Sequence, residues 1–218
     1  MKPKAIFLIR HGESQGNVDK SLYRTVPDWK IPLTPKGHKQ SEDVGIKLRE
    51  LINPEEISTI HHPLQVYCSP WYRTRQTKDG VLKGFNYPDI VVKEDPRIRE
   101  QEWGNFQEKK LIKKIRRERH KYGSFFYRMP HGESGADVYD RVTTFIDTLH
   151  RDFDKIEFPP YCALISHGLT IRVFIMRWFH WTVEEFERYD TPDNCCLIPM
   201  VLQENNKYKL DYTLPLAS

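Results

Sequence analysis

The sequence predicts an α/β fold with a mostly parallel central sheet and helices on both of its faces, giving three α/β/α layers. Residues 4–10 and 161–166 are apolar along nearly their whole length, which is typical of strands buried on both faces. Segments with apolar side chains at helical spacing lie between the strand-like runs. Strands that alternate with amphipathic helices favour a parallel sheet covered by helices.

The N-terminal elements follow directly from the residue pattern. The first strand covers residues 4–10, and a polar loop continues from it to Pro32. A helix begins after Leu33, because Thr34 suits the N-cap and Pro35 suits the first helical position. The side chains of this helix that we expect to pack on the sheet are Val44, Leu48, Leu51 and Ile52.

Further strands and helices are expected in the rest of the chain. The strands are predicted at residues 66–70, 89–93, 161–166, 195–202 and 207–212. The helices are predicted at residues 71–82, 108–122 and 169–178, and from an N-cap at Ser134 through an apolar stripe of Val138, Val142, Phe145, Ile146 and Leu149. A chain of 218 residues without a low-complexity linker fits a single domain over residues 1–218.

The positive charge of the chain is concentrated in one segment. The formal net charge is +4, but residues 109–121 alone contribute eight Lys and Arg side chains against Glu118. Three interpretations of this segment are open. It is the solvated face of a helix, a lid that brings cations to an anionic substrate, or a contact with nucleic acid or an anionic membrane. The third is the weakest because few aromatic residues interleave the cations, so no nucleic-acid partner is expected.

The cysteines and the hydropathy pattern indicate a cytoplasmic protein. Cys68 and Cys162 lie in apolar, strand-like runs that suit buried thiols, and the adjacent pair Cys195 and Cys196 is a poor disulfide candidate. No apolar run approaches the roughly 20 residues that cross a bilayer, and no secretory signal is evident. The aromatic residues around Trp178 belong either to the core or to an interface, so a homo-oligomer is open.

Histidine and arginine side chains follow three of the predicted strands. Arg10 and His11 end the first, Arg73 follows the second, and His167 ends the strand at residues 161–166. Ligands of α/β sheets bind beyond the carboxyl ends of strands, so these groups are expected to converge there. Arginine matches phosphate oxygens, and a neutral imidazole nitrogen can attack phosphorus. The sequence therefore predicts a phosphate site.

The segments that carry these residues resemble the motifs of the histidine phosphatase superfamily, which includes cofactor-dependent phosphoglycerate mutases and many small-molecule phosphatases. The resemblance runs through most of the chain and depends on the order of five segments. They are Leu8-Ile9-Arg10-His11-Gly12-Glu13-Ser14 with Asn17, Leu33-Thr34-Pro35-Lys36-Gly37 with Gln40, residues 69–77, residues 98–104, and Ser166-His167-Gly168. It implies a phosphoglycerate mutase-like fold.

The resemblance assigns a role to each matching residue. His11 would be the nucleophile that takes the phosphoryl group, and Glu100 the proton donor, with Glu102 as its competitor. The groups that would bind phosphate or substrate are Arg10, Ser14, Asn17, Arg73, His167 and Gly168. This scheme requires no metal and no cofactor. The pair His61 and His62 is not expected to bind metal, because adjacent side chains in a strand point to opposite faces and a surface turn fits better.

The resemblance leaves three functions open. The segment from about residue 107 to residue 130 is shorter than the corresponding insertion of the mutases, which favours a phosphatase acting on a small phosphomonoester. A cofactor-dependent phosphoglycerate mutase is the alternative, and a non-catalytic phosphate-binding scaffold is the second. Residues 131–134 repeat the His-Gly-Glu-Ser of residues 11–14, but Pro130 precedes them and a helix follows. We interpret this repeat as a helix start, with Glu133 and Ser134 structural or facing substrate.

Overall fold

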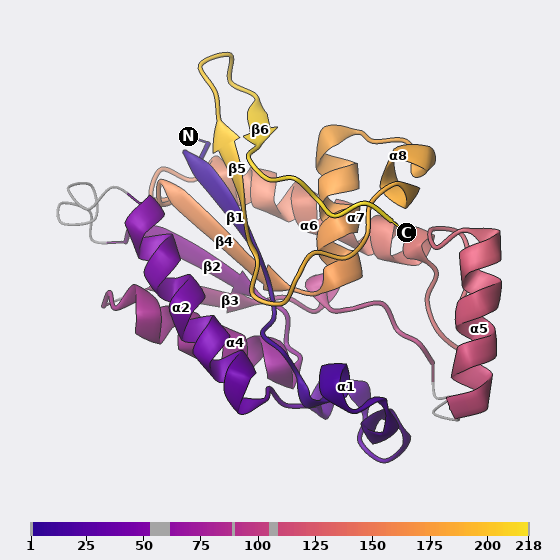
Figure 1. The fold of residues 1–218 in the computed structure, drawn as a ribbon. Helices are drawn as coiled ribbons and strands as arrows, with labels where there is room; N and C mark the ends of the chain where they lie inside the picture. Colours follow the sequence, from indigo (N-terminus) through magenta and orange to yellow (C-terminus); the bar gives the residue numbers. More distant parts are fainter. Residues whose placement is uncertain (1, 53–61, 89, 105–108, 218) are drawn as a thin grey trace.

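A mixed sheet of six strands forms the centre of the molecule in the computed structural model, which describes residues 2–52, 62–88, 90–104 and 109–217 (Figure 1). The order across the sheet is β3-β2-β4-β1-β5-β6. The pairs β1–β4, β4–β2 and β2–β3 are parallel, whereas β5 and β6 extend the sheet in the antiparallel sense. The strands are β1 (Ala5–Arg10), β2 (Leu64–Cys68), β3 (Val91–Glu94), β4 (Tyr161–Ser166), β5 (Leu197–Leu202) and β6 (Tyr208–Leu210).

Helices cover both faces of the sheet, so the predicted three-layer α/β/α fold is confirmed (Figure 1). Helices α2 and α4 pack on one face and α6 and α7 on the other. The described α-helices are α1 (Gln15–Val18), α2 (Pro35–Leu51), α4 (Tyr72–Phe85), α5 (Lys109–Tyr122), α6 (Gly135–Phe153), α7 (Gly168–Phe179) and α8 (Val183–Glu187). Short 3-10 helices are η1 (Lys20–Arg24), η2 (Asp28–Lys30) and η3 (Pro96–Ile98).

The side chains of β1 divide between two apolar cores. Phe7 and Ile9 belong to the core shared with α2 and α4, whereas Ile6 and Leu8 belong to the core shared with α6 and α7. Alternate residues of a strand face opposite sides of a sheet, so an unbroken apolar run is what a strand between two helical layers requires. This burial on both faces holds β1 rigidly and fixes the position of the residues that follow it.

The structure corrects several local predictions. Val44, Leu48 and Ile52 are buried as expected, but Leu51 is 55% exposed, because α2 ends at this residue and Ile52 fills the core. Strand β5 begins two residues later than predicted, since Cys195 has a left-handed backbone (φ 54°) that no strand adopts. The short helices between β1 and α2 were expected as loop, and α8 lies in a stretch for which no element was predicted.

His61 lies outside the described residues, whereas His62 is exposed as a surface turn requires. Within the described ranges, no helix is long and apolar enough to cross a membrane. Cys68 and Cys162 are buried free thiols, as their apolar surroundings predict.

Candidate active site

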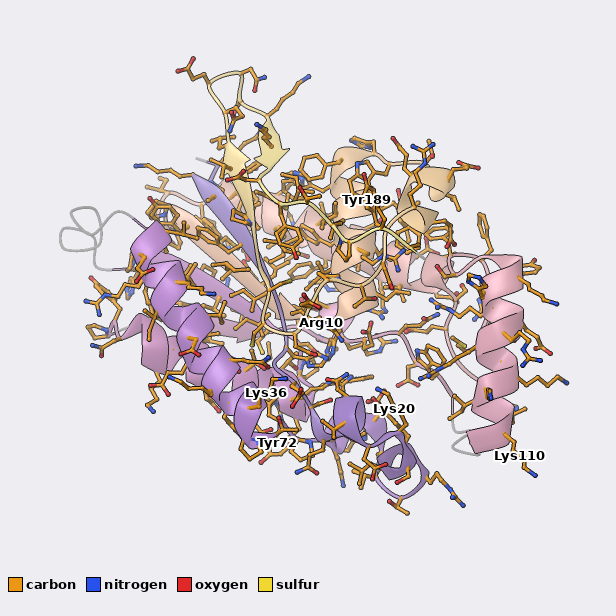
Figure 2. The ribbon with its side chains drawn as sticks, viewed as in Figure 1. Arg10, Lys20, Lys36, Tyr72, Lys110 and Tyr189 are labelled. Carbon is orange, nitrogen blue, oxygen red and sulfur yellow. The ribbon has the colours of Figure 1, made fainter. Side chains whose placement is uncertain are left out.

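A cavity of about 450 Å³ opens beyond the carboxyl ends of the parallel strands, near Arg10 in Figure 2. Its wall contains six of the predicted site residues: Arg10, His11, Ser14, Asn17, Arg73 and Glu100. They come from segments far apart in the sequence, because the parallel strands β1 and β2 bring their ends to the same edge of the sheet. His167 and Gly168 do not contribute to the wall, although His167 contacts residues that do.

His11 is almost fully buried, and one hydrogen bond fixes its tautomer. Its Nδ1 lies 2.7 Å from the carbonyl oxygen of Gly12. A carbonyl oxygen only accepts, so Nδ1 must carry the proton and Nε2 must hold the lone pair. Nε2 in turn accepts a long hydrogen bond of 3.3 Å from Nε of Arg73. The imidazole therefore directs an unprotonated nitrogen towards a guanidinium on the cavity wall.

The surroundings of His11 keep the imidazole uncharged. Burial lowers the pKa of His11 well below its usual 6.5, and the positive charges of Arg73 and Arg10 lower that pKa further. The hydrogen bond to Gly12 opposes this shift but does not reverse it. His11 is consequently neutral at neutral pH, the state in which Nε2 can act as a nucleophile.

Arg73 is held by contacts on three sides. Its Nη1 donates to the backbone carbonyl and to the carboxylate of Asp28, both at 2.8 Å. Its guanidinium also lies 4.5 Å from the ring of Trp71. These contacts hold the buried guanidinium of Arg73 in one orientation beside His11. An anionic oxygen that approached Nε2 of His11 would therefore meet a positive charge already in place.

Arg10 and His167 each have a buried nitrogen atom that no hydrogen bond uses. Within the described chain, Arg10 Nε and His167 Nδ1 are buried nitrogen atoms without a hydrogen-bond partner. Arg10 is anchored by Nη1, which donates to the carbonyl of Pro192 at 2.6 Å. His167 is anchored by Nε2, which lies 2.8 Å from the hydroxyl of Ser69. Unsatisfied buried polar atoms are costly, and a bound anion would remove that cost.

The rings of His11 and His167 meet edge to face, with centroids 5.2 Å apart. His167 is fully buried, and burial lowers its pKa well below 6.5, with further contributions from Arg73 and His11. Gly168 follows at the first position of α7, where an added Cβ would lie 2.2 Å from the methyl carbon of Thr191. His167 thus stands directly behind the cavity wall, in contact with His11 and Trp71, whereas Gly168 packs against Thr191.

Two glutamates of the predicted acid segment line the cavity, and they differ in how they are held. Glu100 is half-buried, and its Oε1 accepts from the amide of Gln101 at 3.0 Å and from the hydroxyl of Thr170 at 3.3 Å. Glu102 is exposed, and its backbone amide donates to Glu133. Among the charges around Arg10, Glu100 does most to offset the effect of burial on its pKa. Glu100 is therefore the glutamate of this pair whose charge acts on Arg10.

The loop after His11 is fixed by polar contacts from distant segments. The hydroxyl and amide of Ser14 both donate to Oδ1 of Asn17 at 2.9 Å. The amide group of Asn194 donates to the His11 carbonyl at 2.9 Å. The Gly12 amide donates to the hydroxyl of Thr77, which itself donates to the Arg73 carbonyl. The last contact links the two segments that carry the nucleophile candidate and its arginine.

Comparison with known proteins identifies this arrangement. Residues 6–213 match the family model of the histidine phosphatase superfamily, branch 1. The chain belongs to the histidine phosphatase superfamily. It is 45% identical to the phosphoglycerate mutase-like protein AT74H of Arabidopsis thaliana, over 95% of this chain and 77% of that protein. It is also 32% identical to the broad-range acid phosphatase DET1 of Saccharomyces cerevisiae, over 98% of this chain and 90% of that protein.

Solved structures of the superfamily share the fold. A protein described as mycobacterial hydrolase 1 superposes with a TM-score of 0.74 at 19% identity, covering 98% of this chain and 99% of that one. The mycobacterial glucosyl-3-phosphoglycerate phosphatase superposes with a TM-score of 0.71, also at 19% identity, covering 97% and 99%. The predicted phosphoglycerate mutase-like fold is thereby confirmed.

The repeat at residues 131–134 is a helix start, as interpreted from the sequence. Ser134 is the N-cap of α6, and Glu133 accepts hydrogen bonds from Arg99 and Arg141. Arg141 also donates to the Glu100 carbonyl at 3.2 Å. Glu133 therefore helps to hold residues 98–104, the segment that carries Glu100, through its bonds to Arg99 and Arg141. It is not one of the residues that line the cavity.

The basic segment forms α5, and one of its arginines reaches the cavity. Arg116 and Ile112 contribute to the wall, which supports the lid interpretation for this part of the helix. Arg117 and the described lysines of α5 are exposed to solvent, as the solvated-face interpretation predicts. Arg116 is itself exposed and so fits both interpretations, whereas Arg117 and these lysines, which are absent from the cavity wall, fit the solvated face alone.

Several residues of the site were not found by sequence reasoning. Asp28 orients Arg73 from the short helix η2, Thr170 contacts Glu100 from the first turn of α7, and Asn194 donates to the His11 carbonyl. Isolated polar residues such as these carry no signal until the fold places them. Among the described residues, no group of three or more His, Cys, Asp or Glu side chains is arranged to hold a metal ion.

Proposed function

We propose that the protein is a phosphatase that hydrolyses a small phosphomonoester through a phosphohistidine on His11, within a single catalytic domain of residues 1–218. The observation that carries the proposal is the tautomer of His11. Its Nδ1 proton is engaged by the Gly12 carbonyl, so the Nε2 lone pair stands beside Arg73 on the wall of the cavity. The name of the yeast relative, a broad-range acid phosphatase, supports the same reaction.

In the first step, the His11 Nε2 lone pair attacks phosphorus and the bond from phosphorus to the ester oxygen breaks. Arg10, Arg73 and His167 donate hydrogen bonds to the phosphoryl oxygens, on which negative charge is spread in the transition state. The protonated carboxyl of Glu100 gives its proton to the departing oxygen, so the product leaves as an alcohol. The free donors Arg10 Nε and His167 Nδ1 support this assignment.

In the second step, the Glu100 carboxylate takes a proton from water, and the water oxygen attacks phosphorus. The bond between phosphorus and Nε2 breaks, inorganic phosphate leaves, and His11 recovers its lone pair. Ser14 and Asn17 keep the loop around His11 in place through both steps, since they are joined by hydrogen bonds. No metal or cofactor is needed in this scheme, so a chelator should leave the turnover intact.

A phosphoglycerate mutase is the second candidate. The name of the Arabidopsis relative and the presence of Arg116 on the cavity wall favour it, because a mutase must retain an acidic intermediate. Product analysis separates the two. A phosphatase releases inorganic phosphate from 3-phosphoglycerate or another phosphomonoester, and in H₂¹⁸O one labelled oxygen enters each phosphate. Conversion to 2-phosphoglycerate with little free phosphate would identify a mutase instead.

The role of Glu100 is tested by comparison with Glu102. Glu100→Gln should lower kcat/KM for an alkyl phosphate by roughly 10²–10³-fold, because general acid catalysis contributes that much to a poor leaving group. The loss should be much smaller for 4-nitrophenyl phosphate, whose leaving group needs no proton. Glu102→Gln is the matched control and should change both substrates little. A larger loss in Glu102→Gln on the alkyl substrate would transfer the acid role to Glu102.

A further inference from the structure

The outer part of the cavity differs in character from its phosphate end. Among the other residues of the wall are Tyr23, Trp29, Trp103, Ile112 and Arg116, and the exposure of Trp29 and Arg116 to solvent places them at the entrance. Aromatic rings present wide, rigid apolar surfaces that bind a flat or ring-shaped group at little entropic cost. A phosphoryl group is polar and gains nothing from such apolar surfaces. This part of the wall therefore suits the group to which the phosphoryl group of a substrate is attached.

Arg116 is held at the entrance by an aromatic ring. Its guanidinium lies 5.5 Å from the centroid of Trp103, and Arg119, one turn further along α5, lies 5.6 Å from the same centroid. Cation–π contacts of this kind orient the guanidinium without neutralising it. In the part of the chain that the structure describes, Arg116 forms no ion pair. Its charge remains available to a ligand.

A second cation, on another element, is close enough to Arg116 and Arg10 to feel their charges. Lys20 begins η1 and lies between α1 and α5 in Figure 2, and its Nζ donates to the Gly16 carbonyl. Burial lowers the pKa of Lys20, and the charges of Arg116 and Arg10 lower it further. A bound anion would stabilise the charged form of Lys20, which burial and these neighbouring cations disfavour.

The carboxylates on the wall are mostly occupied elsewhere. Asp28 pairs with Arg73, and Glu100 is held by Thr170 and by the Gln101 amide. Glu102 is exposed and forms no ion pair with any described residue. None of these three carboxylates therefore forms an ion pair with Arg116 that would compensate its positive charge.

We propose that Arg116, fixed by Trp103, forms a second anion subsite at the cavity entrance, and that the substrate is a phosphomonoester whose leaving group is a ring bearing a second negative charge. This inference rests on the proposed phosphatase function, because it takes His11 as the site of the phosphoryl group. The ring packs between the aromatic walls of Tyr23 and Trp29, and its anionic substituent meets the Arg116 guanidinium.

The subsite can be measured by binding, independently of turnover. Benzylphosphonate and 4-carboxybenzylphosphonate cannot be hydrolysed, and they differ only in the second negative charge. Isothermal titration calorimetry should show that the wild-type protein binds the carboxylated compound about tenfold more tightly, as one charge-assisted hydrogen bond to arginine provides. The preference should weaken as salt is added, because the entrance is open to solvent.

Two variants of α5 make the test specific to Arg116. Arg116→Gln should reduce the tenfold preference to about twofold or less, whereas Arg117→Gln, the same charge change on the exposed face, should keep it. Arg116→Lys retains the charge and should keep part of the preference, which guards against an effect of misfolding in Arg116→Gln. Thermal unfolding of the three variants checks that each is folded.

The outcomes separate this inference from the proposed function. An equal preference in wild type and Arg116→Gln, or no preference in wild type, would overturn the subsite. Turnover of phenyl phosphate and 4-carboxyphenyl phosphate is measured alongside. If neither is hydrolysed while the binding preference persists, the phosphatase proposal fails and the anion subsite stands. If both are hydrolysed without any binding preference, the subsite fails and the phosphatase proposal stands.

Discussion

Residues 11–14 and residues 131–134 carry the same four amino acids, His-Gly-Glu-Ser, in two different settings. The serines act alike in both. The amide and hydroxyl of Ser14 donate to Asn17, and those of Ser134 donate to Asp137, so each serine starts a helix with its third residue as partner. The shared role of the four-residue repeat is therefore to begin a helix, α1 after Ser14 and α6 after Ser134.

The glycines and glutamates also have parallel roles. An added Cβ at Gly12 would lie 2.5 Å from the Gly37 carbonyl oxygen, and one at Gly132 would lie 2.3 Å from the Glu102 carbonyl oxygen. Each glycine therefore allows a close approach of two backbones. Each glutamate then ties its helix start to a cation, Lys36 for Glu13 and Arg141 for Glu133.

Only the histidines differ in kind. His11 follows β1, is 4% exposed, and directs Nε2 towards Arg73. His131 directly follows Pro130 and lies in a turn. Its backbone is left-handed (φ 57°) and its side chain is exposed. The difference teaches that the four-residue motif supplies the local turn, whereas the buried strand and Arg10 in front of it supply the chemistry.

The largest expected difference is between the two histidines. His11→Ala should lower kcat/KM for phenyl phosphate by roughly 10³-fold or more, because no other group of the site replaces the nucleophile. His131→Ala should stay within about threefold of wild type, since its side chain is not among those that line the cavity. Steady-state release of phosphate measures both. Comparable losses in the two variants would remove the distinction drawn between the segments.

The two glutamates should differ in their contribution to stability. Glu133→Ala leaves the largely buried Arg141 without its carboxylate, so the free energy of unfolding should fall by about 3 kcal/mol. Glu13→Ala removes a contact with the exposed Lys36 and should cost distinctly less. Urea unfolding followed by circular dichroism gives both values. The comparison is wrong if Glu13→Ala proves the more damaging change.

Substitution of the two serines should affect stability in both cases but activity in only one. Each alanine variant loses the serine hydroxyl that donates to the third residue of its helix. Ser134→Ala should therefore lower the unfolding free energy by about 1 kcal/mol. Ser14→Ala should in addition lower kcat/KM by roughly tenfold, because Ser14 lines the cavity and holds Asn17. Kinetics measured at a temperature where both variants are folded make the distinction. Unchanged activity in Ser14→Ala would assign that serine a purely structural role.

A smaller effect is expected from pH. The pKa of His11 and that of His167 lie below 6.5 in the folded protein, so between those values and 6.5 the unfolded chain binds protons that the folded protein does not. Stability should therefore fall as the pH drops below about 6.5. Activity should not be lost through protonation of His11 near 6.5: after correction for substrate ionisation, kcat/KM should not decrease as the pH is lowered from about 7.5 to below 6.5. A loss of kcat/KM with an apparent pKa near 6.5 would show that His11 is not kept neutral.

Much of the fold was predictable because it depends on local patterns. The apolar run of β1 and the Thr34 cap of α2 specify their elements from neighbouring residues alone, and the structure confirms both. The sheet order was not predictable, since it depends on pairing between distant strands. Helix α8 was missed because it has only five residues, too few for an apolar stripe to repeat.

The candidate site divides in the same way. Residues attached directly to strand ends, such as His11 and His167, could be placed because the carboxyl ends of parallel strands meet. Asp28 and Arg116 could not be placed, because their positions depend on how η2 and α5 fold back over the sheet edge. The residues that the sequence revealed form the candidate phosphate site, and those that it hid either position these residues, as Asp28 does, or line the remainder of the cavity, as Arg116 does.

The central claim is that the first of the two matching segments carries the nucleophile. Wild-type protein mixed with an excess of aryl phosphate and quenched rapidly in alkaline denaturant should carry one acid-labile phosphoryl group, which peptide mass spectrometry should assign to His11. The His131→Ala variant should carry the same label, and the His11→Ala variant should carry none. Efficient turnover without any trapped phosphohistidine, or a label on another residue, would contradict the account.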